Sequence, residues 1–190
     1  MLIDETKGVQ FLQESMDSIR SGFDDVVHSG PIAHEALRGV KFVLHHFVPH
    51  EDPAHRGLAQ LMPASRRSML GSMLIAEPVL LEPVLGIEIK CPQEQIGTVA
   101  GILSGKRGKL LNVDQKGIIS IITGEVPASE TFDLSKIMRG GTAGKAMWST
   151  YFKVWQVVPQ SILRSLIAET RKRKGLNQEP PNPEDFIDKE

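Results

Sequence analysis

Three things are scarce or missing in this chain: cysteine, long apolar runs and net charge. Cys91 is the only cysteine among 190 residues, which excludes an internal disulfide and suits the reducing cytosol. No apolar run approaches the roughly 20 residues that a membrane-spanning helix needs. Acidic residues occupy the N-terminus, where a signal peptide would carry basic ones. We therefore expect a cytoplasmic chain with no membrane partner.

The near-absence of net charge limits how the chain could meet nucleic acid. The 22 basic and 23 acidic residues leave a formal charge of −1, so no global field attracts the chain to RNA. Any RNA contact must come from local basic patches. The length allows one or two domains that bury roughly 70% of the extended-chain surface. With 41% hydrophobic and 24% charged residues, the composition is that of an ordinary globular protein.

The first part of the chain has the apolar spacing of two helices and a strand. Between residues 7 and 29, apolar residues recur every three or four positions, which predicts an amphipathic helix that Gly30 and Pro31 end. Residues 39–48 are rich in Val, Phe and Leu and predict a strand. Pro63 is expected in the first turn of a second helix, because a proline inside a helix would cost about 3 kcal/mol.

The second part of the chain alternates between strand and helix patterns. The expected elements are strand 85–89, helix 93–103, strand 109–113, a hairpin turn at 114–117, strand 118–122, helix 133–138 and strand 147–157. This βαββαβ order is that of a ferredoxin-like domain. A terminal helix is expected over residues 161–174, with an apolar face that needs a partner. Residues 179–183 (EPPNP) predict an extended tail.

A short loop between the predicted strand and the second helix places one histidine in a special position. Residues 50–57 read HEDPAHRG, and Pro53 and Gly57 restrict the backbone on both sides of His55. We expect this loop to present the His55 imidazole to solvent.

The clustering of all six histidines between His28 and His55 raises the alternative of a metal-dependent enzyme. A strand places His45 and His46 on opposite faces, and His46 and His50 would lie about 13 Å apart if the strand continued. No cysteine or second carboxylate cluster completes a tetrahedral ligand set. We therefore predict no metal site.

Two glycine–lysine segments imitate a phosphate-binding loop. Residues 101–107 (GILSGKR) and 140–146 (GGTAGKA) lack the final Ser or Thr that would hold magnesium, and neither follows a buried parallel strand. No nucleophile elbow is present, and Cys91 is interpreted as a small packed residue. We predict no catalytic residue, no cofactor and no enzymatic activity for this chain.

A basic segment, residues 106–109 (KRGK), joins a helix end to a strand. Cations near a helix C-terminus are favourable on structural grounds alone, but they could equally contact RNA phosphates. The same two interpretations, a structural role or a contact with RNA phosphates, apply to residues 66–67 (RR) and 171–174 (RKRK). For residues 171–174 we favour the structural role, because they end a helix and face an acidic tail.

Residues 50–66, HEDPAHRGLAQLMPASR, resemble the diphthamide loop of the translation elongation factor 2 family. In that family the histidine of the His-Arg-Gly step is modified to diphthamide, and here that residue is His55. The segment GLAQ within this loop is closer to the archaeal form than to the eukaryotic one. Four further segments are similar to the family and occur in its order: TKGVQFL at 6–12, AEPVLLEP at 76–83, KRGK at 106–109 and TAGKA at 142–146.

This resemblance implies an α+β fold with two α/β-sandwich domains. Residues 1–77 would form a partial ribosomal protein S5 domain 2-like domain, corresponding to part of domain IV and completed by residues 159–190. Residues 78–158 would form the ferredoxin-like domain V. The C-terminal helix would pack back on the first domain.

The resemblance also implies a function: the ribosome-binding C-terminal part of a factor that promotes GTP-dependent translocation of tRNA and mRNA. GTP and magnesium would bind to a G domain that this chain lacks. The His55 loop would form the tip that enters the decoding centre. Expected partners are ribosomal RNA, the stalk base, the tRNA–mRNA pair and the diphthamide-synthesis enzymes, and the chain is expected to be monomeric. The candidate RNA contacts are Arg56, Lys106, Arg107 and Lys109. The alternative is a stand-alone two-domain RNA-binding protein without a GTPase partner.

Overall fold

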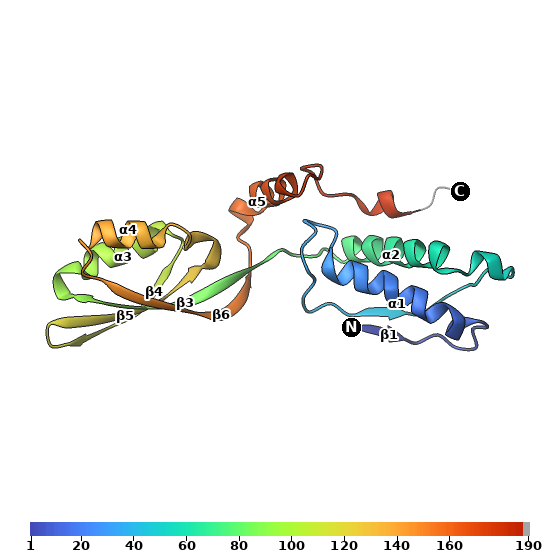
Figure 1. Ribbon diagram of the computed structural model, residues 1–190, viewed down its shortest axis with the longest axis horizontal. Helices are drawn as coiled ribbons and strands as arrows, with labels where there is room; N and C mark the ends of the chain where they lie inside the picture. Colours follow the sequence, from blue (N-terminus) through green and yellow to red (C-terminus); the bar gives the residue numbers. More distant parts are fainter. Residues whose placement is uncertain (188–190) are drawn as a thin grey trace. The chain divides into compact units, whose positions relative to one another are not determined.

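A computed structural model of the chain describes residues 1–187, which form two compact units (Figure 1). Unit 1 combines Met1–Pro78 with the segment that begins at Gln160, and unit 2 is Val79–Pro159. Both units mix helices with β-sheet, so the predicted α+β class is confirmed. Among the described residues, no helix is both long and apolar enough to cross a membrane.

Unit 1 is built on two helices that pack along each other. Its elements are β1 (Leu2–Asp4), α1 (Leu12–His28), β2 (Phe42–Leu44), the 3-10 turn η1 (Pro53–His55), α2 (Leu58–Ile75), α5 (Gln160–Arg173) and the 3-10 turn η4 (Pro183–Phe186). Strand β1 pairs in parallel with β2. The buried core lies between α1 and α2 and consists of Ile19, Val26, Met69 and Leu70.

The structure corrects three predictions in unit 1. Helix α1 begins at Leu12 rather than at residue 7, because Gly8 and Phe11 both have left-handed backbone conformations that helix geometry does not allow. The predicted strand 39–48 is confined to three residues, which are the ones that pair with β1. Pro63 lies inside α2, which starts at Leu58, rather than in its first turn.

Helix α2 tolerates the internal proline because of where it stands. Pro63 cannot donate to the carbonyl of Ala59, one turn earlier, and its ring also crowds that carbonyl. Both residues are exposed, so water can take the freed acceptor. The helix therefore begins at Leu58, separated by two residues from the His55 turn, and Pro63 is its sixth residue.

The C-terminal end of α5 is anchored to the loop that follows α1. Buried Arg171 donates to the carbonyl of Ile32 at 2.9 Å, and Lys174 donates to the carbonyl of Ala33 at 3.0 Å and to Glu35 at 2.6 Å. Burial lowers the pKa of the Arg171 guanidinium. The structural role predicted for residues 171–174 is therefore observed for Arg171 and Lys174, although their partners are loop carbonyls and Glu35 rather than the acidic tail.

The segment predicted as an extended tail ends in an ordered turn. Asn182 caps η4 in a reciprocal arrangement with Asp185, and Phe186 packs against the core of unit 1. Gly71 of α2 provides the space, since a methyl group there would lie 3.1 Å from the Phe186 Cβ. The last three residues of the predicted domain, 188–190, lie outside the described residues.

Unit 2 has the predicted ferredoxin-like order. Its elements are β3 (Leu81–Pro92), the 3-10 turn η2 (Gln93–Gln95), α3 (Ile96–Gly105), β4 (Lys109–Lys116), β5 (Ile119–Pro127), the 3-10 turn η3 (Ala128–Glu130), α4 (Leu134–Gly141) and β6 (Met147–Val157). The antiparallel sheet runs β4-β5-β3-β6, and α3 and α4 cover one face (Figure 1). The hairpin turn lies at residues 117–118 rather than at 114–117, because Asp114–Lys116 still pair with β5 as the end of β4. Gly117 has a φ of 63°, which is accessible to glycine.

The core of unit 2 lies between that face of the sheet and the two helices. Its buried residues include Ile87, Ile89, Val99, Leu103, Ile122, Val126, Leu134 and Met138. Cys91 belongs to the same cluster, and burial raises the pKa of its thiol. The packed role predicted for Cys91 is therefore observed.

Because α1 and α2 pack closely at Gly22, we expect one added methyl group there to lower the stability of unit 1. A Cβ at Gly22 would lie 2.3 Å from the Ser65 Oγ and 2.9 Å from the Met62 carbonyl oxygen. We expect Gly22→Ala to destabilise unit 1 by about 1–3 kcal/mol, the range for overpacking. The measurement is hydrogen exchange of the α1 amides. The control is Gly101→Ala in α3, where a Cβ meets open space and helix propensity should add stability. Equal exchange in Gly22→Ala and the unsubstituted chain would contradict the close packing.

Candidate functional site

The His55 turn is a single, well-capped turn of 3-10 helix. The Asp52 side chain accepts a hydrogen bond from the Ala54 N–H at 2.9 Å, and the His55 N–H donates to the Asp52 carbonyl at 3.1 Å. Pro53 occupies the first position of the turn, where its fixed φ fits and no N–H is needed. The turn is exposed, so the His55 imidazole is accessible to solvent.

Gly57 has a different role from the one expected. Its φ of −74° and ψ of 165° are open to any residue, so its backbone freedom is not used. Gly57 is instead the residue that caps α2, and the helix starts at the next position. The expected backbone restriction at Gly57 is therefore not observed. His55 stands two residues before the helix cap.

A second histidine lies against His55. The ring centroids of His50 and His55 are 4.5 Å apart, with an angle of 55° between the planes. The backbone N–H of Asp52 donates to Nδ1 of His50 at 3.0 Å, so this nitrogen must be the unprotonated acceptor. The turn therefore fixes the position of the His50 ring and makes its Nδ1 a hydrogen-bond acceptor.

Arg56, a candidate RNA contact, is folded into the turn. Its side chain is 8% exposed and donates to the carbonyls of His50 at 2.8 Å and Glu51 at 2.7 Å. The guanidinium carbon lies 4.0 Å from the centroid of the Phe11 ring, and Glu14 is 3.7 Å away. Sequence reasoning missed these partners because Phe11 and Glu14 are more than 40 residues distant in the chain.

The remaining histidines do not converge on one point. His45 lies 3.5 Å from Glu5, and the ring of His28 is 2.7 Å from the Asp24 carbonyl. Among residues 1–187, no group of three or more His, Cys, Asp or Glu side chains is arranged to hold a metal ion.

The three cations of the basic segment 106–109 differ in their exposure and in their hydrogen-bond partners. Lys106 donates to both oxygens of Asp133 at 2.6 and 2.7 Å, and these hydrogen bonds hold the pKa of that carboxyl below its ordinary value. Lys109 is exposed, and its side chain forms no hydrogen bond or ion pair with the part of the chain that the structure describes. Lys109 is thus the cation of this segment that is most available to a phosphate.

Arg107 is the centre of an ion-pair network. It makes a bidentate contact with Glu82 at 2.8 and 2.9 Å and donates to Glu130 at 2.8 Å. The hydrogen bonds to Glu82 raise the pKa of the guanidinium above its ordinary value, with Glu130 adding to the effect. Glu82 is buried, so Arg107 neutralises a carboxylate that would otherwise be costly to bury.

The two glycine–lysine segments lie at the wrong ends of their helices for phosphate binding. Residues 101–107 run through the last turns of α3 and out of it, and residues 140–146 leave the end of α4. A phosphate loop requires a helix N-terminus, where backbone N–H groups are free. The prediction that neither is a nucleotide site agrees with this placement.

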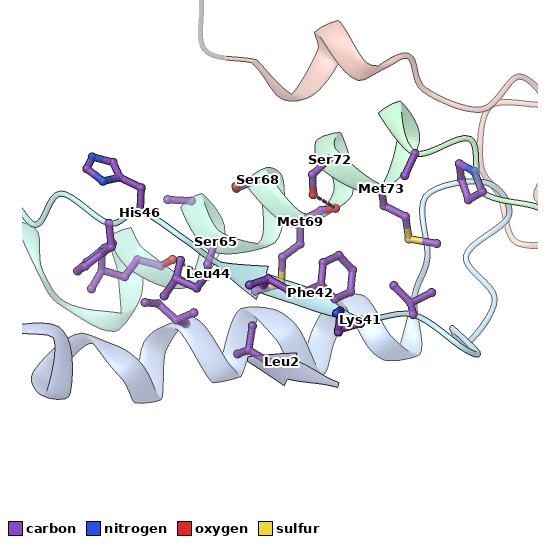
Figure 2. Close-up of a pocket in the computed structure, with 18 of the residues that line it drawn as sticks. Leu2, Lys41, Phe42, Leu44, His46, Ser65, Ser68, Met69, Ser72 and Met73 are labelled. Atoms are coloured by element: carbon purple, nitrogen blue, oxygen red, sulfur yellow. Dashed lines mark hydrogen bonds between the residues drawn. The ribbon is translucent and has the colours of Figure 1, made fainter. Parts of the chain in front are cut away.

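A pocket of about 700 Å³ lies in unit 1 and was not predicted (Figure 2). The side chains of Phe42, Met69 and Met73 lie between β2 and α2, and His46 stands at one end. Of its described lining residues, Lys41 and His46 alone are titratable. Such a lining offers apolar contact rather than acid–base chemistry.

The ion-pair network predicts that Arg107 and Lys109 differ in their effect on stability. Removing Arg107 leaves Glu82 buried without its cation, and we expect Arg107→Ala to destabilise unit 2 by about 2–4 kcal/mol. Lys109→Ala, the matched control, should change stability by less than about 0.5 kcal/mol. Both tryptophans, Trp148 and Trp155, lie in β6, so fluorescence during urea unfolding reports on unit 2. Equal midpoints for the two variants would leave Arg107 without a structural role.

The predicted site residues fall into two separate groups. His55 and Arg56 belong to unit 1, while Lys106, Arg107 and Lys109 belong to unit 2. The first group is a turn with an exposed imidazole, and the second offers one exposed cation beside two paired ones. Neither group contains the nucleophile–base pair that covalent catalysis needs.

Comparison with known proteins assigns each unit to a family region. The family model described as "Elongation factor G, domain IV" matches residues 1–77, and the one described as "Elongation factor G C-terminus" matches residues 79–166. The chain is 57% identical over 190 residues to an elongation factor 2 of Cenarchaeum symbiosum (strain A), covering 100% of this chain and 26% of the relative. It is 49% identical over 187 residues to that of Staphylothermus marinus, covering 98% of this chain and 25% of the relative.

A third relative, the elongation factor 2 of Metallosphaera sedula, is 48% identical over 187 residues, which cover 98% of this chain and 25% of the relative. The chain therefore spans about a quarter of the length of these curated relatives. The resemblance to the elongation factor 2 family is confirmed. The chain belongs to the elongation factor G and elongation factor 2 family, and it carries the sequence of that family's domain IV and C-terminal regions.

Proposed function

We propose that this chain is the ribosome-binding part of an archaeal-type elongation factor 2, acting in the GTP-dependent translocation of tRNA and mRNA. The observation that carries the proposal is the exposed His55 turn, held by its own cap within residues that match domain IV of the family. In this proposal the turn is the tip that enters the decoding centre of the cytoplasmic ribosome. GTP and magnesium are bound by other parts of the complete factor.

The proposed mechanism is positional rather than covalent. A rigid tip inserted beside the codon–anticodon pair can hold that pair in register while the ribosome moves, and correct placement alone can contribute large rate factors. The capped turn and the helix that starts directly after it suit such a role, because both limit how far His55 can move. The chemistry of GTP hydrolysis is not required of these residues.

His55 is the proposed site of diphthamide modification. Its ring is exposed, whereas a buried ring could not enter the active site of a modifying enzyme. Diphthamide carries a cationic trimethylammonium group, which would bring positive charge to RNA phosphates near the tip. The diphthamide-synthesis enzymes are therefore proposed partners of this unit, together with the ribosome.

Lys109 is the proposed phosphate contact of unit 2. Of the three cations in residues 106–109, it is the one not already held by a carboxylate. The contact would lie on ribosomal RNA, with the stalk base as a second proposed partner of this unit. Lys106 could add to this contact only by leaving Asp133.

A chimeric factor tests the role of His55. The matching quarter of the Cenarchaeum symbiosum elongation factor 2 would be replaced by this chain and the rate of translocation measured on archaeal ribosomes. We expect the chimera to translocate, and His55→Ala to slow it by about tenfold or more, because the tip loses its modified side chain. His45→Ala, which removes another exposed histidine of unit 1, is the control and should have little effect. Equal slowing by both substitutions would argue against a special role for His55.

The salt dependence of ribosome binding tests Lys109 in the same chimera. Loss of one phosphate contact should reduce the slope of log affinity against log salt by roughly 0.7–0.9. The matched control is Lys116→Ala, which removes an exposed lysine from the other end of β4. An unchanged slope for Lys109→Ala would remove Lys109 from the RNA contact.

A further inference from the structure

We propose that Arg56 is a positioning residue for His55 and not an RNA contact. In this proposal its guanidinium clamps the His55 turn onto the start of α1, and His55 is modified efficiently only while the clamp is closed. The statement about modification rests on the function proposed for His55. The clamp itself rests on geometry alone.

The clamp joins two segments that are far apart in sequence. On one side are the carbonyls of His50 and Glu51, which accept hydrogen bonds from the same guanidinium nitrogen of Arg56. On the other side are the Phe11 ring and the Glu14 carboxylate at the start of α1. The start of α1 and the turn before α2 lie at the same end of unit 1 in Figure 1. Arg56 is therefore the link between them.

The conformation of Phe11 supports a specific contact with Arg56. Its φ of 59° and ψ of 11° are left-handed, which costs a non-glycine residue free energy, and the residue is 43% exposed. The ring is held beside the guanidinium at 4.0 Å, within the range of a cation–π interaction, and Arg56 is left with only 8% of its side chain exposed. This arrangement places a partly exposed aromatic ring against an almost fully covered cation.

The clamp acts on His55 through the first residues of the turn. Holding the His50 carbonyl fixes the backbone that carries the His50 ring, and that ring accepts the Asp52 N–H and lies 4.5 Å from the His55 ring. Arg56 follows His55 directly, so it ties the end of the turn to its beginning. Without the guanidinium, residues 50 and 51 are no longer tied to the end of the turn, and the two histidine rings are free to separate.

Arginine suits this task and lysine does not. A planar guanidinium can donate to two carbonyls while its face lies on an aromatic ring, whereas an ammonium is a compact point charge on a flexible stem. Nε of Arg56 is buried without a hydrogen-bond partner among the described residues, so the group accepts a desolvation cost to hold this position. The substitution Arg56→Lys therefore separates the two roles, because it keeps the charge that a phosphate needs and removes the clamp.

The test uses the 190-residue chain with isotope-labelled histidine. Nuclear Overhauser signals between the His50 and His55 rings report the closed turn, and peptide mass spectrometry after incubation with diphthamide-synthesis enzymes reports the rate of His55 modification. We expect Arg56→Lys to abolish the signals between the rings and to slow modification by about tenfold or more. Phe11→Leu, which removes the aromatic face but leaves Arg56 in place, should act in the same direction.

Two matched controls separate the clamp from general effects of substitution. Arg20→Lys changes an exposed arginine on α1, and Phe132→Leu changes a phenylalanine that is 91% exposed. Both should leave the signals between the rings and the modification rate unchanged. Amide spectra of α1 and α2 establish that every variant is folded, and an unfolded Arg56→Lys would leave Phe11→Leu to carry the test.

The outcomes are distinct. Signals between the rings that persist in Arg56→Lys and Phe11→Leu would overturn the clamp. Separated rings with His55 modified at the unsubstituted rate would overturn the positioning role of Arg56. An unmodified His55 in the unsubstituted chain would contradict the function proposed for His55. The clamp would in that case still be decided by the signals between the two rings.

Discussion

The close packing of α1 against α2 is the contact on which the rest of unit 1 depends. Gly22 allows it, because a larger residue would collide with Ser65 and with the backbone of α2. The pairing of these helices brings the start of α1 to the start of α2, where Phe11 meets Arg56. The loop that leaves α1 at its other end receives Arg171 from α5. One helix pair thus positions both the His55 turn and the C-terminal helix.

Three arginines organise the chain by the same chemistry. Arg56 and Arg171 donate to backbone carbonyls, and Arg107 binds two carboxylates. In each case the guanidinium satisfies several acceptors at once, which its planar arrangement of donors permits. A basic residue near a proposed RNA-binding surface is therefore a poor guide to RNA contact in this protein. The exposed Lys109, without such partners among the described residues, is the better candidate.

The sequence predicted those features that are contiguous and long enough to show a pattern. In unit 2 the strands are long enough for alternation to show, and β6 was predicted with the bounds it has, Met147–Val157. In unit 1 the strand β1 was missed, because a segment of three residues shows no period. The exposed loop that carries His55 could be predicted because its motif is continuous in sequence. The role of Arg56 could not, because it depends on Phe11, which reaches it only once α1 and α2 have packed. The family resemblance therefore gave Arg56 only as a candidate RNA contact.

A positional mechanism requires a turn that rarely opens. The hydrogen bonds of the Arg56 clamp contribute enough free energy to keep the turn closed. Hydrogen bonds that involve a charged group contribute about 1.5–3 kcal/mol each, and Arg56 donates two to the turn. Because every 1.4 kcal/mol changes a population about tenfold, even the lower value for both bonds would disfavour the open turn by roughly a hundredfold. The Asp52 cap adds to this through its hydrogen bond with the Ala54 N–H. His55 can therefore remain exposed, as the proposed modification and binding require, while its backbone stays fixed.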